Sequence, residues 1–448
     1  MINLESTINV KAGCHTPAID MNDTSPTPSI DFASADEAMA ILNVRLQTLY
    51  AYVSRGLIRS VRQPGRRERL YWRDDLRRIA DRSRARAGHG PAAASAMNWG
   101  EPIIPTSITE ITAEGPRYRG RLAVDLARMR APFESVADLI WTAAWDDKAP
   151  AWTIEHAPAE QKRMIRTLTS LHSYDQIIEV FALVTLQIGL LRGSVAERVR
   201  GGRTVDAGRQ IIQTLVGFCG LATERGRYTP LRDGQTIVTG LLQALSVPVT
   251  DENYEAIEAT LTLLADHELS PGTLAARVCA SSGGSLHSCI AAAMCASSGA
   301  QTGLLYELID DFIAEANKAS VLVNRAKKLR ARGVAIPGFV HPLYPRGDPR
   351  AAYLLDVLKR RTVQTAPMKA IYAFVNNVEV NDSIFPRHEL AVVALVRAMG
   401  LPKHVSAVLF VMARVVGWIA HVQEQRLSGS LLRPRARFVS AAASQILP

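Results

Sequence analysis

Most of the chain beyond residue 101 consists of segments whose apolar residues recur at the spacing of an α-helix. Two clear examples are residues 175–191, DQIIEVFALVTLQIGLL, and residues 253–264, NYEAIEATLTLL. Apolar residues three and four positions apart form a stripe along one helix face, which is buried against other helices. Extended β-branched runs are scarce, and no strand followed by a glycine-rich phosphate loop is present. The sequence therefore predicts an all-α body and gives no support to nucleotide hydrolysis.

A short basic segment precedes this body. Residues 45–86 contain thirteen arginines and no lysine against four acidic residues, in a chain whose net charge is +10. The excess positive charge thus belongs to one module and not to the whole surface. From Ser34 the sequence SADEAMAILNVRLQTLYAYVSRGLIRS has helical apolar spacing on both sides of a break at Asn43, and Gln63-Pro64-Gly65 follows as a turn. We predict two short helices and then a basic turn between two extended pieces.

Residues 34–86 resemble a winged helix-turn-helix domain of the MerR-like type through this pattern and the YWRDDLRRI that follows it. In such a domain the second helix enters the major groove of DNA, and the wing contacts phosphates. We therefore expect DNA binding, and the alternative is a small interaction or dimerisation module whose arginines face solvent. The candidate DNA-binding residues are Gln47 and Thr48 on the second helix and Arg62, Arg66 and Arg67 on the wing.

The remaining boundaries follow from composition. Residues 1–33 are rich in Thr, Ser, Pro, Asn and Asp without sustained periodicity, so we expect a disordered arm. Residues 87–101 are expected to form a linker, and residues 102–448 a large helical domain. The five cysteines show neither CxxC pairing nor zinc-ligand spacing, which indicates no disulfide framework and no structural metal.

The expected location is the cytoplasm, without membrane association. The N-terminus MINLESTINVKAGC lacks the basic flank and apolar run of a secretory signal. The longest apolar stretches are interrupted at Gly189, at Arg192 and at Arg414, short of the roughly 18 uninterrupted apolar residues of a membrane span.

Five stretches of the large domain resemble citrate synthase, in the order and spacing of that family. They are GPRYRGRLAVDLA (115–127), the FESVADLIW that follows it, ADHELSPGTLAARVCASSGGSLHS (265–288), GFVHPLYPRGDPRA (338–351), and RAMGLPKHVSAVLFVMARVVGWIAHVQEQRLSGSLLRPRARFV (397–439). The resemblance is closest to the short bacterial forms, some of which carry an N-terminal helix-turn-helix. It implies an all-α dimer that condenses oxaloacetate with acetyl-CoA, or another short acyl-CoA, to citrate and CoA, with no cofactor beyond the co-substrate.

Joining a thioester methyl carbon to an α-keto dicarboxylate needs a base, a donor for the enolate oxygen, a donor for the ketone, and cations for two carboxylates. An arginine suits each carboxylate because its planar fork donates two parallel hydrogen bonds. By the resemblance His341 serves the ketone, and Arg433 reaches into the partner subunit's site. The residues that the resemblance assigns to the dicarboxylate are His267, Arg350, Arg414 and Arg433.

Two positions depart from the family on the acyl-CoA side. Thr302, in GAQTGL, stands where the family has the histidine that stabilises the enolate, and Glu389, 25 residues before Arg414, stands where it has an aspartate base. Loss of one such donor costs roughly 10² to 10³ in rate, so we expect weakened condensation. Two alternatives remain: a non-catalytic regulator that senses a dicarboxylate and binds DNA, and one subunit of a heteromeric citrate synthase.

Overall fold

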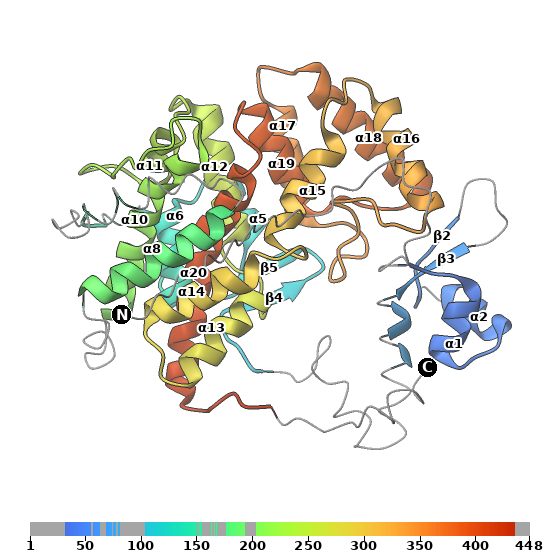
Figure 1. Cartoon of the computed structure of the whole chain (residues 1–448), viewed down its shortest axis with the longest axis horizontal. Coiled ribbons are helices and arrows are strands. Elements are labelled where there is room, and N and C mark those ends of the chain that lie inside the picture. Colours follow the sequence, from blue (N-terminus) through green and yellow to red (C-terminus); the bar gives the residue numbers. More distant parts are fainter. Residues whose placement is uncertain are drawn as a thin grey trace, which may run out of the picture.

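The computed structural model describes residues 32–54, 57–62, 69–73, 75–77, 79–80, 104–148, 150, 152–154, 163, 165, 167, 176–192 and 203–434. The arm before residue 32 and the linker at 87–101 lie outside these residues. The described part is mostly helical, as the sequence predicted, with the helices distributed between a small N-terminal module and a large body (Figure 1).

The N-terminal module combines two helices with a three-stranded antiparallel sheet. Helices α1 (Ala35–Leu42) and α2 (Leu46–Ser54) are separated by Asn43, which ends α1 in the left-handed conformation with φ at 50°. Ser34 and Glu37 form a capping box that satisfies free amides at the start of α1. The sheet has the order β1-β3-β2, from Phe32–Ala33, Arg69–Trp72 and Ser60–Arg62.

This sheet corrects one boundary of the sequence analysis, which assigned residues 32 and 33 to the disordered arm. In the structure Phe32 pairs with Trp72 and Ala33 with Tyr71. The pairing buries Ala33 completely within a core that the module makes for itself, around Leu49 and Tyr71. A strand of two residues has no periodicity of its own, so only its distant partner defines it.

The large body opens with a small antiparallel sheet that the all-α prediction did not contain. Its strands are β4 (Thr109–Thr112), β5 (Gly115–Tyr118) and β6 (Arg121–Leu122), in that order. The body is otherwise helical. Its helices are α5 (Ala123–Arg128), α6 (Phe133–Thr142), α8 (Ile177–Arg192), α10 (Arg203–Phe218), η2 (Cys219–Ala222), α11 (Ile237–Ala244), α12 (Asp251–Leu264), α13 (Pro271–Ser281), α14 (Leu286–Ser297), α15 (Gly303–Ile313), α16 (Ala319–Ala331), α17 (Pro349–Lys359), α18 (Ala366–Asp382), α19 (His388–Ala398) and α20 (Val405–Ser428).

Helix α20 is the central helix of the body. In Figure 1 it runs between α8, α13 and α14 on one side and α12 on the other, and it packs against all four. It is long and apolar enough to cross a membrane by length and composition, but its whole apolar window is buried among other helices. Burial on every side explains why this helix is hydrophobic all round instead of amphipathic.

The helices around α20 form two groups (Figure 1). The first group runs from α5 to α14. The second runs from α15 to α19, and in it α17 packs on α19 and α16 on α18. Helices α15 and α19 also contact α20. Segments from both groups therefore meet at α20, and the predicted site residues of the large domain lie around this meeting point, with the exception of Arg433.

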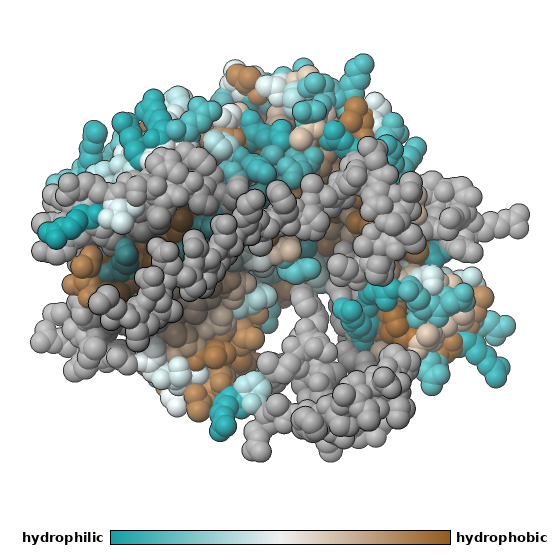
Figure 2. Space-filling view, viewed as in Figure 1, coloured by the Kyte–Doolittle hydropathy of each residue, from teal (hydrophilic) through white to brown (hydrophobic). Residues whose placement is uncertain are grey.

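Apolar side chains remain exposed on the first group. Figure 2 shows them at the lower left of the body, over α8, α13 and α14. Leu190 is 80% exposed, which is far more than a leucine of a packed helix. The other large exposed apolar residues on α8 and α13 are Leu183, Leu186, Leu191 and Val278.

Candidate functional site

His267 lies in a tight turn after α12 that is fixed by α20. The amide of Gly417 donates to the carbonyl oxygen of Ala265 at 3.0 Å, and a Cβ at Gly417 would lie 2.1 Å from Oδ1 of Asp266. Only glycine permits this approach. His421 Nε2 lies 3.2 Å from Oδ2 of the same aspartate, and both side chains are fully buried. These contacts of Gly417 and His421 hold the turn, and therefore His267, against α20.

His341 is placed by a second loop that pairs with the segment before α19. The amide of Val340 donates to Phe385 O at 2.9 Å, and the amide of Arg387 donates to Gly338 O at 2.8 Å. Val340 has a φ of 63°, a left-handed conformation that is costly for a β-branched residue. This pairing brings His341 close to the start of α19, where Glu389 lies.

The two histidines meet at Tyr344. Nε2 of His267 lies 2.9 Å from the Tyr344 hydroxyl, and the ring centroids of His267 and His341 are 5.4 Å apart. Burial and the nearby Arg350 lower the pKa of His341 to about 3 and hold the pKa of His267 well below its usual value. Both imidazoles are therefore neutral at pH 7. Because the amide of Leu343 donates to Nδ1 of His341 at 3.2 Å, its proton is on Nε2, which is free to donate to a ketone oxygen.

Two buried arginines flank these histidines. Arg350, at the start of α17, is fully buried and donates from Nη2 to Asp348 at 2.9 Å, while its Nη1 has no hydrogen-bond partner. Arg414, on α20, is 3% exposed and donates from Nε to the Leu264 carbonyl at 2.8 Å. Within the described part of the chain, no carboxylate lies within 4.0 Å of Arg414. The charge of Asp266 acts on this guanidinium only from beyond ion-pair distance, and a buried charge without a direct ion pair is costly, so this geometry favours an anionic ligand.

The two acyl-side residues are both engaged elsewhere. The Thr302 hydroxyl donates to the Ser297 carbonyl at 2.6 Å and has no second proton for an enolate oxygen. Glu389 is 5% exposed, and the guanidinium of Arg387 donates hydrogen bonds to both of its carboxylate oxygens, at 2.5 and 3.0 Å. Arg387 and His388 hold the pKa of Glu389 well below its usual value, although burial alone would raise it. A carboxylate held in this way is a weak base.

Two neighbours of the site were not identified from the sequence. His388 Nδ1 lies 3.3 Å from Oδ2 of Asp348 and 3.2 Å from Oε2 of Glu389, so it bridges two carboxylates. The Tyr306 hydroxyl is buried without a hydrogen-bond partner. Each of them had only one signal in the sequence. His388 directly precedes Glu389, and Tyr306 lies four residues after Thr302.

One cluster has the size of a metal site. Donor atoms of His341, Asp348 and His388 all lie within 4.8 Å of one another. The carboxylate of Asp348 is already occupied, because Arg350 donates to both of its oxygens and the His388 amide donates to Oδ2. Binding a cation there would break the ion pair with Arg350 and leave a second buried cation uncompensated. The donor set therefore fits a hydrogen-bond network better than a metal ion.

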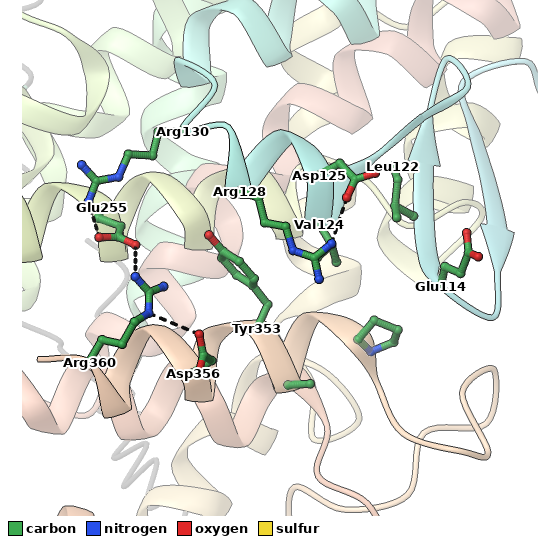
Figure 3. A pocket seen from close by; sticks show the side chains of 12 residues that line it. Glu114, Leu122, Val124, Asp125, Arg128, Arg130, Glu255, Tyr353, Asp356 and Arg360 are labelled. Atoms are coloured by element: carbon green, nitrogen blue, oxygen red, sulfur yellow. Dashed lines mark hydrogen bonds and ion pairs between the residues drawn. The ribbon is translucent and has the colours of Figure 1, made fainter.

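A hollow of about 900 Å³ lies along the exposed face of α17 (Figure 3), whereas Arg350 of the same helix is buried. Its charges neutralise one another. Glu255 contacts both Arg130 and Arg360, and Arg360 also contacts Asp356. These pairs leave little net charge to attract a ligand, and none of the histidines of the cluster lines the hollow.

The remaining predicted residues lie elsewhere. Gln47 and Thr48 are in the first half of α2, exposed and half-buried respectively. Arg62 ends β2, while Arg66 and Arg67 fall outside the described residues. Arg433 is exposed after the end of α20, so within one chain it is not brought to the cluster.

The fold and this cluster define a helical protein in which buried histidines and arginines meet beside the central helix. The chain belongs to the citrate synthase family: residues 97–435 match the C-terminal domain of citrate synthase. This match confirms the family resemblance and the all-α class of the large domain.

Relatives and solved structures agree with this assignment. The 2-methylcitrate synthase of Shewanella oneidensis is 29% identical over 201 residues, which are 43% of this chain and 52% of that protein. Citrate synthase 2 of Bacillus subtilis is 28% identical over 197 residues, 43% of this chain and 53% of that protein. The chain thus spans about half the length of these curated relatives.

Among solved structures, citrate synthase from Thermotoga maritima has a TM-score of 0.62 at 20% identity, covering 77% of this chain and 96% of that one. Citrate synthase from Thermoplasma acidophilum, in a ternary complex with carboxymethyl coenzyme A and oxaloacetate, has a TM-score of 0.64 at 19% identity, covering 75% and 94%. At this identity the likeness shows the fold.

Proposed function

We propose that this chain binds a four-carbon dicarboxylate of the oxaloacetate type at His267, His341, Arg350 and Arg414. The observation that carries the proposal is the buried Arg414, which has no carboxylate within 4.0 Å in the described part of the chain. Arg350 is already paired with Asp348, but its free Nη1 offers a second donor to a carboxylate of the ligand. The Nε2 proton of His341 would meet the ketone oxygen.

Condensation of the bound oxaloacetate with acetyl-CoA, or another short acyl-CoA, is proposed to be slow. The base at Glu389 is held by Arg387, and the Thr302 hydroxyl is committed to Ser297. Thr302 and Glu389 thus both weaken the step that acts on the acyl-CoA, the formation and stabilisation of its enolate. The dicarboxylate half of the reaction is unaffected by either.

The active assembly is proposed to be a dimer. The exposed leucines of α8 favour burial against a second copy, and Arg433 is exposed and therefore available to a partner subunit. In the heteromeric alternative, the partner subunit is a second citrate synthase chain that has the base and the histidine which this chain lacks. It would cover the same leucines and receive the same Arg433.

A second candidate function is a regulator in which dicarboxylate binding is reported to DNA. It is favoured by the N-terminal module, where α1 and α2 are joined by a tight turn and Gln47 is exposed on α2. The regulator differs from the enzyme in that binding of oxaloacetate, without turnover, would be enough for its function.

The test is thiol release from acetyl-CoA in the presence of oxaloacetate, by the parent and by the Thr302→His, Glu389→Asp double variant. The proposal expects slow release by the parent and a clear gain in the double variant. Fast release by the parent would contradict the weakened acyl side.

A further inference from the structure

The hydroxyl of Tyr306 is one of several buried polar groups in the described part of the chain that lack a hydrogen-bond partner. The residue is 2% exposed, and its hydroxyl oxygen has no hydrogen-bond partner. Most buried hydroxyls in folded proteins are hydrogen-bonded, because an unsatisfied one costs free energy. What distinguishes this hydroxyl is its place close to the candidate site, where a ligand can accept its proton.

Its position is defined by packing between α15 and α20. The centroid of the Tyr306 ring lies 5.8 Å from that of Phe410, and the guanidinium carbon of Arg414 lies 5.2 Å from the centroid of the same phenylalanine. Tyr306 and Arg414 thus both lie against the ring of Phe410.

The electrostatic surroundings agree with this position. Burial and the charge of Glu389 raise the pKa of Tyr306, against the opposing effect of Arg414 and Arg350. The phenol therefore keeps its proton at neutral pH and is a donor. The charges of Glu389 and of both arginines therefore act on this hydroxyl.

Tyr306 lies in the first turns of α15, four residues after Thr302, which is the N-cap residue of that helix. The Thr302 hydroxyl proton is committed to the Ser297 carbonyl, whereas the Tyr306 proton is not committed. Of these two hydroxyls, only that of Tyr306 is available to a ligand.

We infer that the Tyr306 hydroxyl is the donor that this site offers to an anionic ligand oxygen near Arg414 and Glu389. The inference deepens the proposed function and rests on it. The shared chemistry is an oxygen that carries negative charge, and two sources fit: a carboxylate of the dicarboxylate, or the enolate of the acyl-CoA. A phenol suits this task because its ring is held by packing and only the proton must orient.

The experiment compares Tyr306→Phe with the parent in the full-length protein. Calorimetric titrations with oxaloacetate alone report the carboxylate source, and titrations with carboxymethyl-CoA on the oxaloacetate-saturated protein report the enolate source. Loss of a hydrogen bond to a charged oxygen should weaken one of the two affinities by about ten- to a hundredfold. Tyr228→Phe, whose ring packs on Phe218 of α10, is the matched control and should leave both affinities unchanged.

Thermal unfolding without ligand separates a binding role from a structural one. If the hydroxyl has no partner within the fold, Tyr306→Phe should keep or raise the ligand-free Tm by about 1–3 °C, because it removes an unsatisfied buried group. A fall in the ligand-free Tm, or both affinities within twofold of a parent that binds oxaloacetate, would overturn the inference and leave the proposed function standing. A parent that binds no oxaloacetate would overturn both.

Discussion

Arg387 holds Glu389 by both carboxylate oxygens, with Nη2 2.5 Å from Oε1 and Nε 3.0 Å from Oε2. The two residues are separated by a single position at the start of α19, where Arg387 is the extended N-cap residue with φ at −93° and ψ at 161°. The ion pair lowers the pKa of the carboxyl group that the family resemblance assigns as the base. In the proposed function, the acyl side of the site is therefore limited by this ion pair as well as by the identity of residue 389.

Replacing Arg387 by asparagine should release this carboxylate. Its pKa should rise towards the ordinary value, and thiol release from acetyl-CoA with oxaloacetate should increase at least about tenfold, since a positioned base contributes roughly 10² to 10⁴ in rate. Arg387→Lys, which keeps a cation beside the carboxylate, is the control and should stay within about threefold of the parent. Equal rates in the parent and Arg387→Asn would show that the ion pair does not limit the base.

Arg414 should destabilise the ligand-free protein. In urea unfolding without ligand, Arg414→Leu should raise the free energy of unfolding by about 1–4 kcal/mol, because it removes a buried charge whose only compensation, from Asp266, lacks a direct ion pair. Arg397→Leu is the matched control. Arg397 pairs with Asp310 at 2.6 Å, so its replacement should lower the free energy of unfolding by roughly 1–3 kcal/mol. A clear loss of stability in Arg414→Leu would mean that the fold itself supplies a partner for this guanidinium.

Stability should fall on acidification, starting near pH 6.5. His267, His341 and His388 have folded pKa values below their unfolded values, chiefly because of burial. Below about pH 6.5 the unfolded chain therefore binds protons that the folded chain does not, and each such histidine lowers the free energy of unfolding by about 1.4 kcal/mol per pH unit. This loss continues down to the folded pKa, about 3 for His341.

The measurement is urea unfolding at several pH values between about 7 and 4.5, which brackets the unfolded histidine pKa. His388→Gln removes one of these groups and should reduce the slope of stability against pH by up to about 1.4 kcal/mol per pH unit. An unchanged slope in this variant would show that His388 is charged in the folded protein.

Much of the large domain follows from its sequence, because its helices are long and strongly periodic. The ordered motifs place His267, His341, Arg350 and Arg414 in segments that the fold brings together. The ion pair of Arg387 with Glu389 and the unsatisfied hydroxyl of Tyr306 could not be predicted in the same way. The first depends on the extended backbone before α19, and the second on the packing of α15 against α20. Neither has a sequence period.

The N-terminal module should bind duplex DNA through its basic wing. Arg66→Ala and Arg67→Ala should each reduce the slope of log affinity against log salt by about 0.9, because each variant removes one cation from a phosphate. Gln47→Ala should change sequence preference with little effect on that slope. The measurement is fluorescence anisotropy of labelled duplexes between roughly 50 and 200 mM salt.

In the sensor hypothesis, saturating oxaloacetate shifts this DNA affinity at least about fivefold. Absence of salt-dependent DNA binding by the full-length protein would contradict the DNA-binding role.

The central claim is that the dicarboxylate half of the site is intact while the acyl half is impaired. Its most direct test is a calorimetric titration of the purified full-length protein with oxaloacetate, beside Arg414→Leu. The account predicts saturable binding by the parent that Arg414→Leu weakens by more than about a hundredfold, because the variant cannot form the buried ion pair with the ligand. Absence of binding by the parent at millimolar oxaloacetate, or equal affinity in the two proteins, would contradict it.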